Sequence, residues 1–122
     1  MILTDEQIQI QGMVRDFARD KILPGAEARS RESRFPRAEL DAMAELGLLG
    51  MLVPDEFGGA GLGYLSFVLA MEEIAAADGA LSTILSVHST PASTAILKFG
   101  SVQQKAEWLP KLTSGQIIGA FA

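Results

Sequence analysis

The sequence predicts an all-α fold in which a single strand begins at the C-terminal end. Three observations predict it: apolar residues recur at helical spacing, two capping boxes mark helix starts, and only residues 116–122 have the composition of a strand. A glycine-rich loop, VPDEFGGAGLG at residues 53–63, joins two helical layers. We therefore expect a helical domain over residues 1–115, followed by the start of a β structure at residues 116–122.

Composition limits the function classes. The chain has 122 residues, which suggests one domain, and 48% of them are apolar. A mean hydropathy of +0.25 predicts that some apolar surface faces a partner. The net charge of −5 argues against binding of nucleic acid through phosphates, and the lack of cysteine excludes disulfides and thiolate chemistry. No basic region precedes an apolar run at the N-terminus, so a cytoplasmic location without a membrane span is expected.

The first helix begins at a capping box, in which Thr4 and Gln7 are expected to exchange hydrogen bonds. Its core-facing positions, at helical spacing, are Ile10, Val14, Phe17 and Ala18. Pro24 and Gly25 are expected to bend or interrupt this helix. The charged run 26–34 predicts a continuation with a solvated face.

A second helix is expected to start near Pro36 and to end at Gly47 in the left-handed conformation. The apolar run 48–53 then predicts a buried, extended segment that leads into the glycine-rich loop. Residues 64–77 predict a third helix. Its expected apolar side consists of Phe67, Val68, Met71, Ile74 and Ala75.

Two adjacent carboxylates lie in the middle of that third helix, at Glu72 and Glu73. Neighbouring residues on a helix point about 100° apart, so this pair is not ready for acid–base catalysis. We expect both residues to lie on the surface or in salt bridges. Asp78 and Gly79 then break the helix.

Residues 79–97 contain no Asp, Glu, Lys or Arg. Seven Ser or Thr residues, His88 and Pro91 argue against a membrane span, so the pattern predicts a helix buried in protein and kinked at Pro91. Such a helix is either plain core or the wall of a ligand cavity, and the residues alone favour plain core. A lone histidine is likewise more often a core or pocket residue than a catalyst.

A second capping box, Ser101 with Gln104, starts the last helix, and residues 113–115 predict a turn. The strand expected at 116–122 has no partner in the sequence, and an unpaired strand is not stable. We therefore expect the chain to be a fragment of a longer protein.

Three groups of motifs together resemble the acyl-CoA dehydrogenase family, specifically its N-terminal helical domain. They are ELGLLG (45–50) with VPDEFGGAGL (53–62), MEEIA (71–75) with SVHS (86–89), and FGSVQQK (99–105) with LPKL (109–112) and GAFA (119–122). The resemblance covers essentially the whole chain, and SVHS is most similar to the short-chain and branched-chain members. It implies that residues 116–122 start the first strand of a middle β domain.

The resemblance also implies chemistry. In that family FAD and an acyl-CoA are enclosed together, a carboxylate takes the α proton, and the β hydrogen leaves as hydride to the flavin. No catalytic residue maps onto this chain, because the family's catalytic Glu lies beyond Ala122. Phe121 and Ala122 map onto the first flavin-contacting positions. The acyl-pocket positions map onto Ile84, Val87, His88 and Pro91, and His88→Leu is accordingly expected to change acyl selectivity more than stability.

Partners and alternatives follow from the same resemblance. It implies an acyl-CoA substrate, electron-transfer flavoprotein as the electron acceptor, and a homo-oligomeric full-length protein, with this chain inactive by itself. An acyl-CoA oxidase or a flavin monooxygenase of related architecture remains a second enzyme hypothesis. A complete helical interaction module, binding a partner through its apolar surface, is a third.

Overall fold

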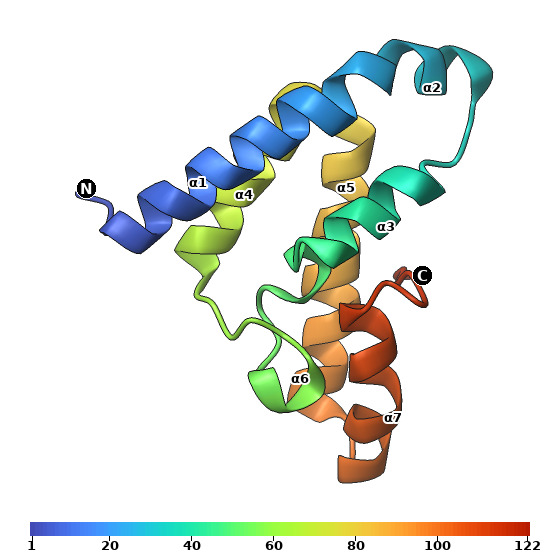
Figure 1. The fold of residues 1–122 in the computed structure, drawn as a ribbon. Helices are drawn as coiled ribbons and strands as arrows, with labels where there is room; N and C mark the ends of the chain where they lie inside the picture. Colours follow the sequence, from blue (N-terminus) through green and yellow to red (C-terminus); the bar gives the residue numbers. More distant parts are fainter.

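The computed structural model describes all residues, 1–122, and the predicted all-α fold is confirmed (Figure 1). The α-helices are α1 (Asp5–Phe17), α2 (Ala26–Glu32), α3 (Arg37–Glu45), α4 (Tyr64–Ala77), α5 (Gly79–Val87), α6 (Ala95–Phe99) and α7 (Val102–Thr113). Two π-helical segments extend them, Ala18–Ile22 after α1 and His88–Thr94 between α5 and α6. Short 3-10 turns occur at Leu23–Gly25, Leu48–Gly50 and Asp55–Phe57.

The strand expected at residues 116–122 is not formed, and the chain contains no strand. A strand needs a paired neighbour to satisfy its backbone, and no strand is formed elsewhere in the chain to supply one. The segment instead turns back onto the helices, where the Ile117 N–H donates to the Lys111 carbonyl at 3.2 Å. The proposed domain boundary at residue 115 stays a prediction.

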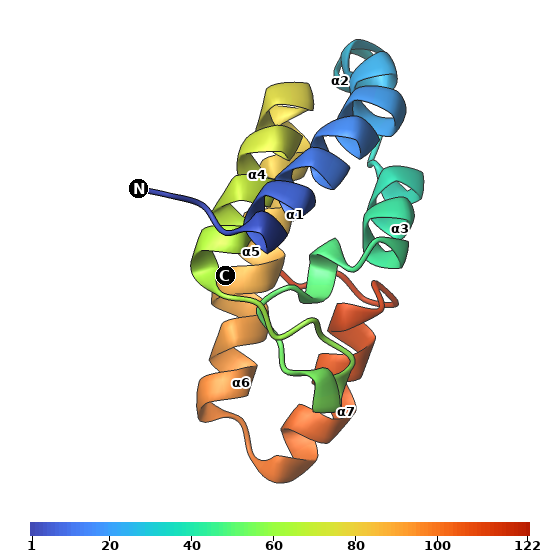
Figure 2. The same cartoon turned by 60° about the vertical axis from the view of Figure 1, so that its left-hand side comes forward.

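The helices form two groups around a continuous rod, in which α5, the His88–Thr94 segment and α6 follow one another (Figures 1 and 2). On one side α1 packs against α4, and the main core lies between these helices, α3 and α5. Towards the other end of the rod, α7 runs back beside α6 and buries a smaller cluster, which consists of Val53, Leu109 and Leu112.

The helix starts follow the predicted capping chemistry. In both capping boxes, Thr4 with Gln7 and Ser101 with Gln104, the two residues exchange backbone-to-side-chain hydrogen bonds of 2.9–3.2 Å. Asp78 breaks α4 as predicted and also caps α5, because its Oδ1 accepts from the N–H groups of the next helix. Gly47 adopts the predicted left-handed conformation, with φ +84°.

Three local predictions were wrong. Residues 48–50 are buried as expected but form a 3-10 turn rather than an extended segment, because α3 ends at a sharp left-handed Gly47. On α4, Val68 is 47% exposed and Ala75 is also exposed. Phe67 and Ile74 are buried as predicted, but the buried side of α4 also extends to Ser66, Leu69 and Ala70, because α4 packs between α1 and α5.

The charged run 26–34 is not uniformly solvated, because Arg29 is only 5% exposed. Its Nη2 lies 2.9 Å from Asp78 Oδ2, its Nη1 lies 3.0 Å from Glu39 Oε1, and Nη2 also donates to the Ile22 carbonyl at 2.6 Å. Arg29 therefore ties α2 to α3 and to the α4–α5 junction, as a buried charge held by paired hydrogen bonds.

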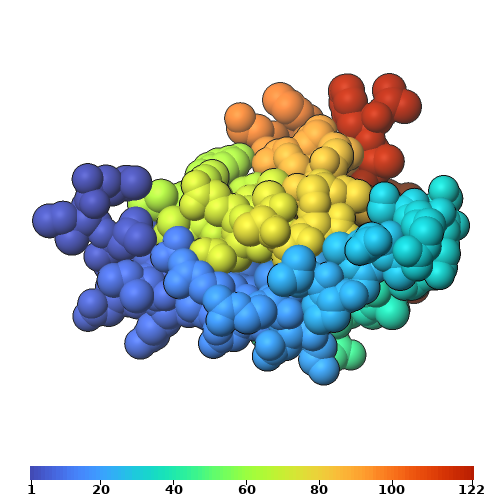
Figure 3. Space-filling view, turned by 90° about the horizontal axis from the view of Figure 1, so that it is seen from above, coloured from blue at the N-terminus to red at the C-terminus, as the bar shows by residue number.

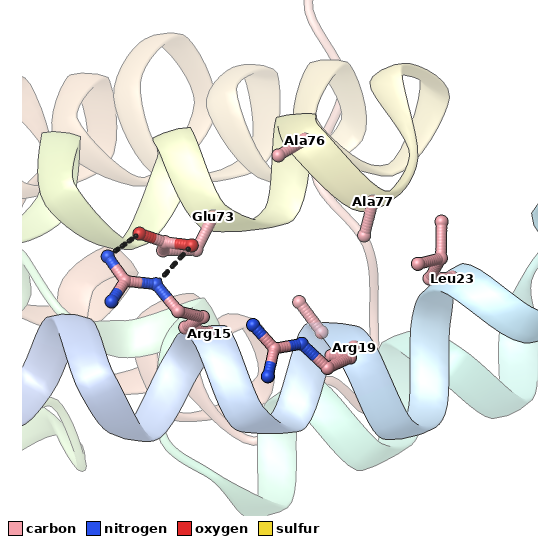
Figure 4. A pocket seen from close by; sticks show the side chains of 7 residues that line it. Arg15, Arg19, Leu23, Glu73, Ala76 and Ala77 are labelled. Atoms are coloured by element: carbon pink, nitrogen blue, oxygen red, sulfur yellow. Dashed lines mark hydrogen bonds and ion pairs between the residues drawn. The ribbon is translucent and has the colours of Figure 1, made fainter.

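Glu73 is salt-bridged, as predicted, and Glu72 lies on the surface. The Arg15 guanidinium on α1 contacts Glu73 on α4 through two hydrogen bonds, of 2.8 and 3.2 Å, at the edge of a shallow hollow of about 190 Å³ (Figure 4). This bond raises the pKa of Arg15 above its ordinary value. The pair links the two helices across their exposed side. None of the helices combines the length and the apolar composition that a membrane span requires.

Candidate functional site

The predicted pocket positions Ile84 and Val87 lie together in one apolar hollow of about 260 Å³. They are three residues apart on α5, so their side chains share a face of the helix. The C-terminal segment and Phe35, in the loop before α3, contribute the rest of its apolar lining. The complete lining, which we call the apolar hollow, is Phe35, Thr83, Ile84, Val87, Ile118, Gly119 and Ala120.

His88 does not line the apolar hollow, because its side chain is fully buried behind it. Its Nδ1 accepts a hydrogen bond from the Gly119 N–H at 2.9 Å, so the ring proton belongs on Nε2. That Nε2 lies 3.0 Å from the Leu112 carbonyl oxygen and donates to it. One neutral imidazole therefore connects the rod, the end of α7 and the C-terminal segment.

Burial lowers the pKa of His88 below its ordinary value of 6.5, and the bond to the Leu112 carbonyl opposes this only in part. The folded protein therefore keeps the ring neutral at a pH where the unfolded chain already binds a proton. The unfolded state binds more protons just below pH 6.5, so this contribution to stability is complete above that pH and is lost as the pH falls.

We expect wild-type stability to fall more steeply than that of His88→Asn when the pH is lowered from 7 to 5.5. The extra slope of the wild-type free energy of unfolding against pH is at most about 1.4 kcal/mol per pH unit. Urea unfolding of both proteins at several pH values measures it, and His88 is the single histidine, so carboxylate titration cancels in the comparison. Parallel pH profiles would show that the imidazole is as basic in the folded protein as in water.

Pro91, the fourth predicted pocket position, is half-buried and lies outside the apolar hollow. The predicted kink takes the form of a π-helical segment, because Pro91 has no N–H to donate. Hydroxyl groups satisfy the widened turn: Ser93 donates to the His88 carbonyl at 2.8 Å and Thr94 to the Ser89 carbonyl at 3.0 Å. The structure thus places Ile84 and Val87 together in the apolar hollow, and His88 and Pro91 outside its lining.

Phe121 and Ala122, the predicted cofactor contacts, lie at the free end of the C-terminal segment. Phe121 is 75% exposed, and this segment projects at one edge of the surface beside the rod (Figure 3). Neither residue makes a hydrogen bond within the chain. An exposed aromatic ring with a free backbone fits a role as one contact of a flat ring system, but two residues do not form a binding site.

The glycine-rich loop lines the largest hollow, of about 560 Å³, against α7. It cannot cradle a phosphate, because the N–H groups of residues 57–62 all donate to backbone carbonyls of residues 50–55. The loop serves packing instead. The Thr113 hydroxyl donates to the Phe57 carbonyl at 3.0 Å, and Gly50 and Gly58 lie so close to Thr113 that a Cβ at either would be 3.0 Å from it.

The site holds no acid–base pair. No Asp or Glu lines the apolar hollow, and no three His, Asp or Glu side chains gather where they could ligate a metal ion. Three contributions to the site went unpredicted: Phe35 at its edge, the C-terminal segment as its wall, and the bond from Gly119 to His88. The proline before α3 and the glycine at 119 were the only signals in the sequence for any of them.

Comparison with known proteins gives consistent matches. The sequence model of the family "acyl-CoA dehydrogenase, N-terminal domain" matches residues 4–116. An acyl-CoA dehydrogenase of Bacillus subtilis (strain 168) is 43% identical over 122 residues, which is 100% of this chain and 32% of that protein. The mitochondrial short-chain specific acyl-CoA dehydrogenase of Mus musculus is 47% identical over 108 residues, 88% of this chain and 26% of that protein. The chain therefore spans about a third or less of the length of these relatives.

Solved structures share the fold. A glutaryl-coenzyme A dehydrogenase in complex with glutaryl-CoA has a TM-score of 0.93 and 35% identity, over 98% of this chain and 31% of that one. A glutaryl-CoA dehydrogenase from Mycobacterium smegmatis, in complex with FADH2, has a TM-score of 0.90 and 31% identity, over 95% of this chain and 30% of that one. Both likenesses extend over nearly all of the helices described above.

Proposed function

The chain belongs to the acyl-CoA dehydrogenase family, as an N-terminal domain, and on that premise we propose that it forms part of a flavin-dependent dehydrogenase acting on a short or branched acyl-CoA. The full-length protein removes one hydrogen from the α carbon and one from the β carbon of the acyl group. This chain supplies part of the acyl pocket and is inactive by itself.

The apolar hollow is the observation that carries the proposal. Pockets for apolar ligands are concave and lined mainly by hydrophobic side chains, as this one is. Ile84 and Val87 contact the acyl chain from the helix side, and residues 118–120 enclose it from the other. His88 and Pro91 complete the acyl wall from behind. Both residues act through the shape of the rod, and the imidazole of His88 makes no contact with the acyl chain.

FAD is the cofactor in this proposal, with Phe121 and Ala122 among its contacts. Acceptance of a hydride is the chemistry that FAD supplies when it is bound. Phe121 offers an exposed ring for packing, and the free N–H groups of both residues are open to a polar atom. The base that takes the α proton comes from elsewhere in the full-length protein, since no carboxylate lines the apolar hollow.

The proposal includes electron-transfer flavoprotein as the acceptor, a homo-oligomeric full-length protein and a cytoplasmic location. The alternative enzyme is an acyl-CoA oxidase or a flavin monooxygenase on the same fold. A stand-alone helical interaction module is the alternative outside enzymes, and the exposed Phe99 and Val102 at the α6–α7 turn are the observation that favours it.

Purified full-length protein separates these functions. We expect flavin bleaching under anaerobic conditions with butyryl-CoA or isovaleryl-CoA, weaker bleaching with octanoyl-CoA, and turnover when electron-transfer flavoprotein is added. Hydrogen peroxide produced at the rate of substrate consumption would indicate the oxidase. Residues 1–122 alone are expected to bind neither FAD nor acyl-CoA tightly, and stoichiometric yellow flavin on this fragment after equilibrium dialysis would contradict that expectation.

Filling the apolar hollow tests its role directly. Val87→Phe adds a ring where Val87 faces Ile118, so the full-length protein should keep its activity on butyryl-CoA and lose activity on longer substrates. The ratio of kcat/KM for butyryl-CoA to kcat/KM for longer acyl-CoAs should rise by roughly tenfold or more. Val68→Phe is the matched control, because Val68 is exposed on α4. Equal changes in kcat/KM for all chain lengths, or none with Val87→Phe, would place the acyl chain elsewhere.

A further inference from the structure

The C-terminal segment has one hydrogen bond beyond residue 117, and His88 provides it. Among residues 118–122 the single bond is the one from the Gly119 N–H to His88 Nδ1, at 2.9 Å. The chain enters this stretch from the Ile117 N–H, which donates to the Lys111 carbonyl. Between these two points nothing but packing holds Ile118 in place.

Close packing fixes the position of the Gly119 backbone. A Cβ on Gly119 would lie 2.5 Å from the Ala92 Cβ and 3.2 Å from Leu112 Cδ2. The Gly119 backbone therefore lies directly against the π-helical segment His88–Thr94 and against α7. The imidazole is fixed from its other side, because Nε2 donates to the Leu112 carbonyl at 3.0 Å. The Gly119 N–H is therefore anchored to an acceptor that cannot rotate away.

The anchored residues are also one wall of the apolar hollow. Ile118, Gly119 and Ala120 face Ile84 and Val87 across it. The width of the hollow thus depends on where the segment lies, and the next residues along the chain are Phe121 and Ala122. The one hydrogen bond in this stretch therefore lies in the wall of the hollow, two residues before Phe121.

We propose that His88 is a positioning residue, which fixes the segment 118–120 against α5 through the Gly119 N–H and so sets the width of the acyl pocket. It makes no contact with the substrate. This inference rests on the proposed function, which names the ligand of the hollow, and it assigns His88 a role distinct from both a pocket contact and a plain core residue.

Two amide substitutions separate the two bonds of the ring. The side chain of Asn reaches the position of Nδ1 and accepts from Gly119, whereas that of Gln reaches the position of Nε2 and donates to Leu112. Each variant keeps one bond and loses one, so both are expected to lose similar stability. They differ in whether the segment stays anchored.

The first readout needs no activity. In the full-length protein, hydrogen–deuterium exchange followed by mass spectrometry should resolve the protected Gly119 amide within a peptide covering residues 116–122. That amide should exchange roughly tenfold faster in His88→Gln than in His88→Asn, which should exchange like the wild type. Gly119→Ala keeps His88 but pushes the segment off Ala92, and it should reproduce the fast exchange of His88→Gln.

The second readout is acyl preference. His88→Gln and Gly119→Ala should raise KM for butyryl-CoA severalfold and narrow the difference in kcat/KM between short and long acyl-CoAs. His88→Asn should keep the wild-type order of kcat/KM among these substrates. Equal exchange and equal preference in the Asn and Gln variants would overturn the proposal and leave His88 as core. If exchange splits as expected but no acyl-CoA is oxidised, the positioning role stands and the proposed function fails.

Discussion

Gly59→Ala is expected to lower the free energy of unfolding by about 3 kcal/mol, a large share of the stability of a small domain. A Cβ at residue 59 would overlap the carbonyl group of Val53 and would lie 2.7 Å from the Val53 Cβ. The clash is with backbone, which cannot swing aside as a flexible side chain does. Two adjacent bonds, from Ala60 N–H to the Gly50 carbonyl and from Gly61 N–H to the Val53 carbonyl, both 2.9 Å, resist movement of the loop.

Urea unfolding followed by far-ultraviolet circular dichroism measures this loss, and Gly12→Ala is the matched control. Gly12 lies inside α1, and an added methyl group there would have no neighbouring atom within 4 Å, so the same substitution should stabilise by about 0.5–1 kcal/mol. If Gly59→Ala unfolded at the wild-type urea concentration, the loop would not be packed on residues 50–53 in solution.

Arg29→Leu is expected to destabilise the protein by about 3–5 kcal/mol, because it removes the closest cation from two largely buried carboxylates. The side chains of Asp78 and Glu39 are only 11% and 13% exposed, so little water can replace the guanidinium, and Glu39 keeps only a longer contact of 3.9 Å to Arg34 Nη2. The Ile22 carbonyl also loses its donor at the end of the first π-helical segment. Loss of this one residue therefore loosens α2, α3 and the α4–α5 junction together.

Arg31→Leu is the control for charge, since it removes the same group two residues further along α2. The Arg31 Nη1 lies 3.7 Å from Glu27 Oε1, and both side chains are largely exposed, so the change should stay within about 0.5 kcal/mol. Thermal unfolding of the three proteins gives the comparison. Similar melting temperatures for Arg29→Leu and Arg31→Leu would mean that the buried ion pairs contribute no more than surface ones.

Features set by neighbouring residues could be predicted from the sequence. The capping boxes, the break at Asp78 and the left-handed Gly47 each depend on contacts within a few residues. Ile84 and Val87 also fall on one face by spacing alone. The burial of Arg29 could not be predicted, because its partner Asp78 is 49 residues away and nothing in a polar run marks which charge turns inward.

The failed strand and the position of His88 have a common physical reason. Residues 116–122 have the composition of a strand, but strand structure requires a paired neighbour, and here the backbone bonds to helices instead. The partners of His88 lie 24 and 31 residues away, at the Leu112 carbonyl and the Gly119 N–H. Both bonds use backbone atoms, which carry no residue identity and leave no trace in a pattern.

The π-helical segment at His88–Thr94 changes the direction in which side chains point from the rod, so that α5 and α6 present different faces. Each residue of an α-helix advances the side-chain direction by about 100°, so one extra residue in a turn reorients everything beyond it. Ile84 can thereby face the apolar hollow while Ile96 and Leu97 face the cluster around Leu109. A one-residue insertion or deletion at this joint would turn one half of the rod relative to the other without unwinding either, which offers evolution a compact way to reshape the pocket.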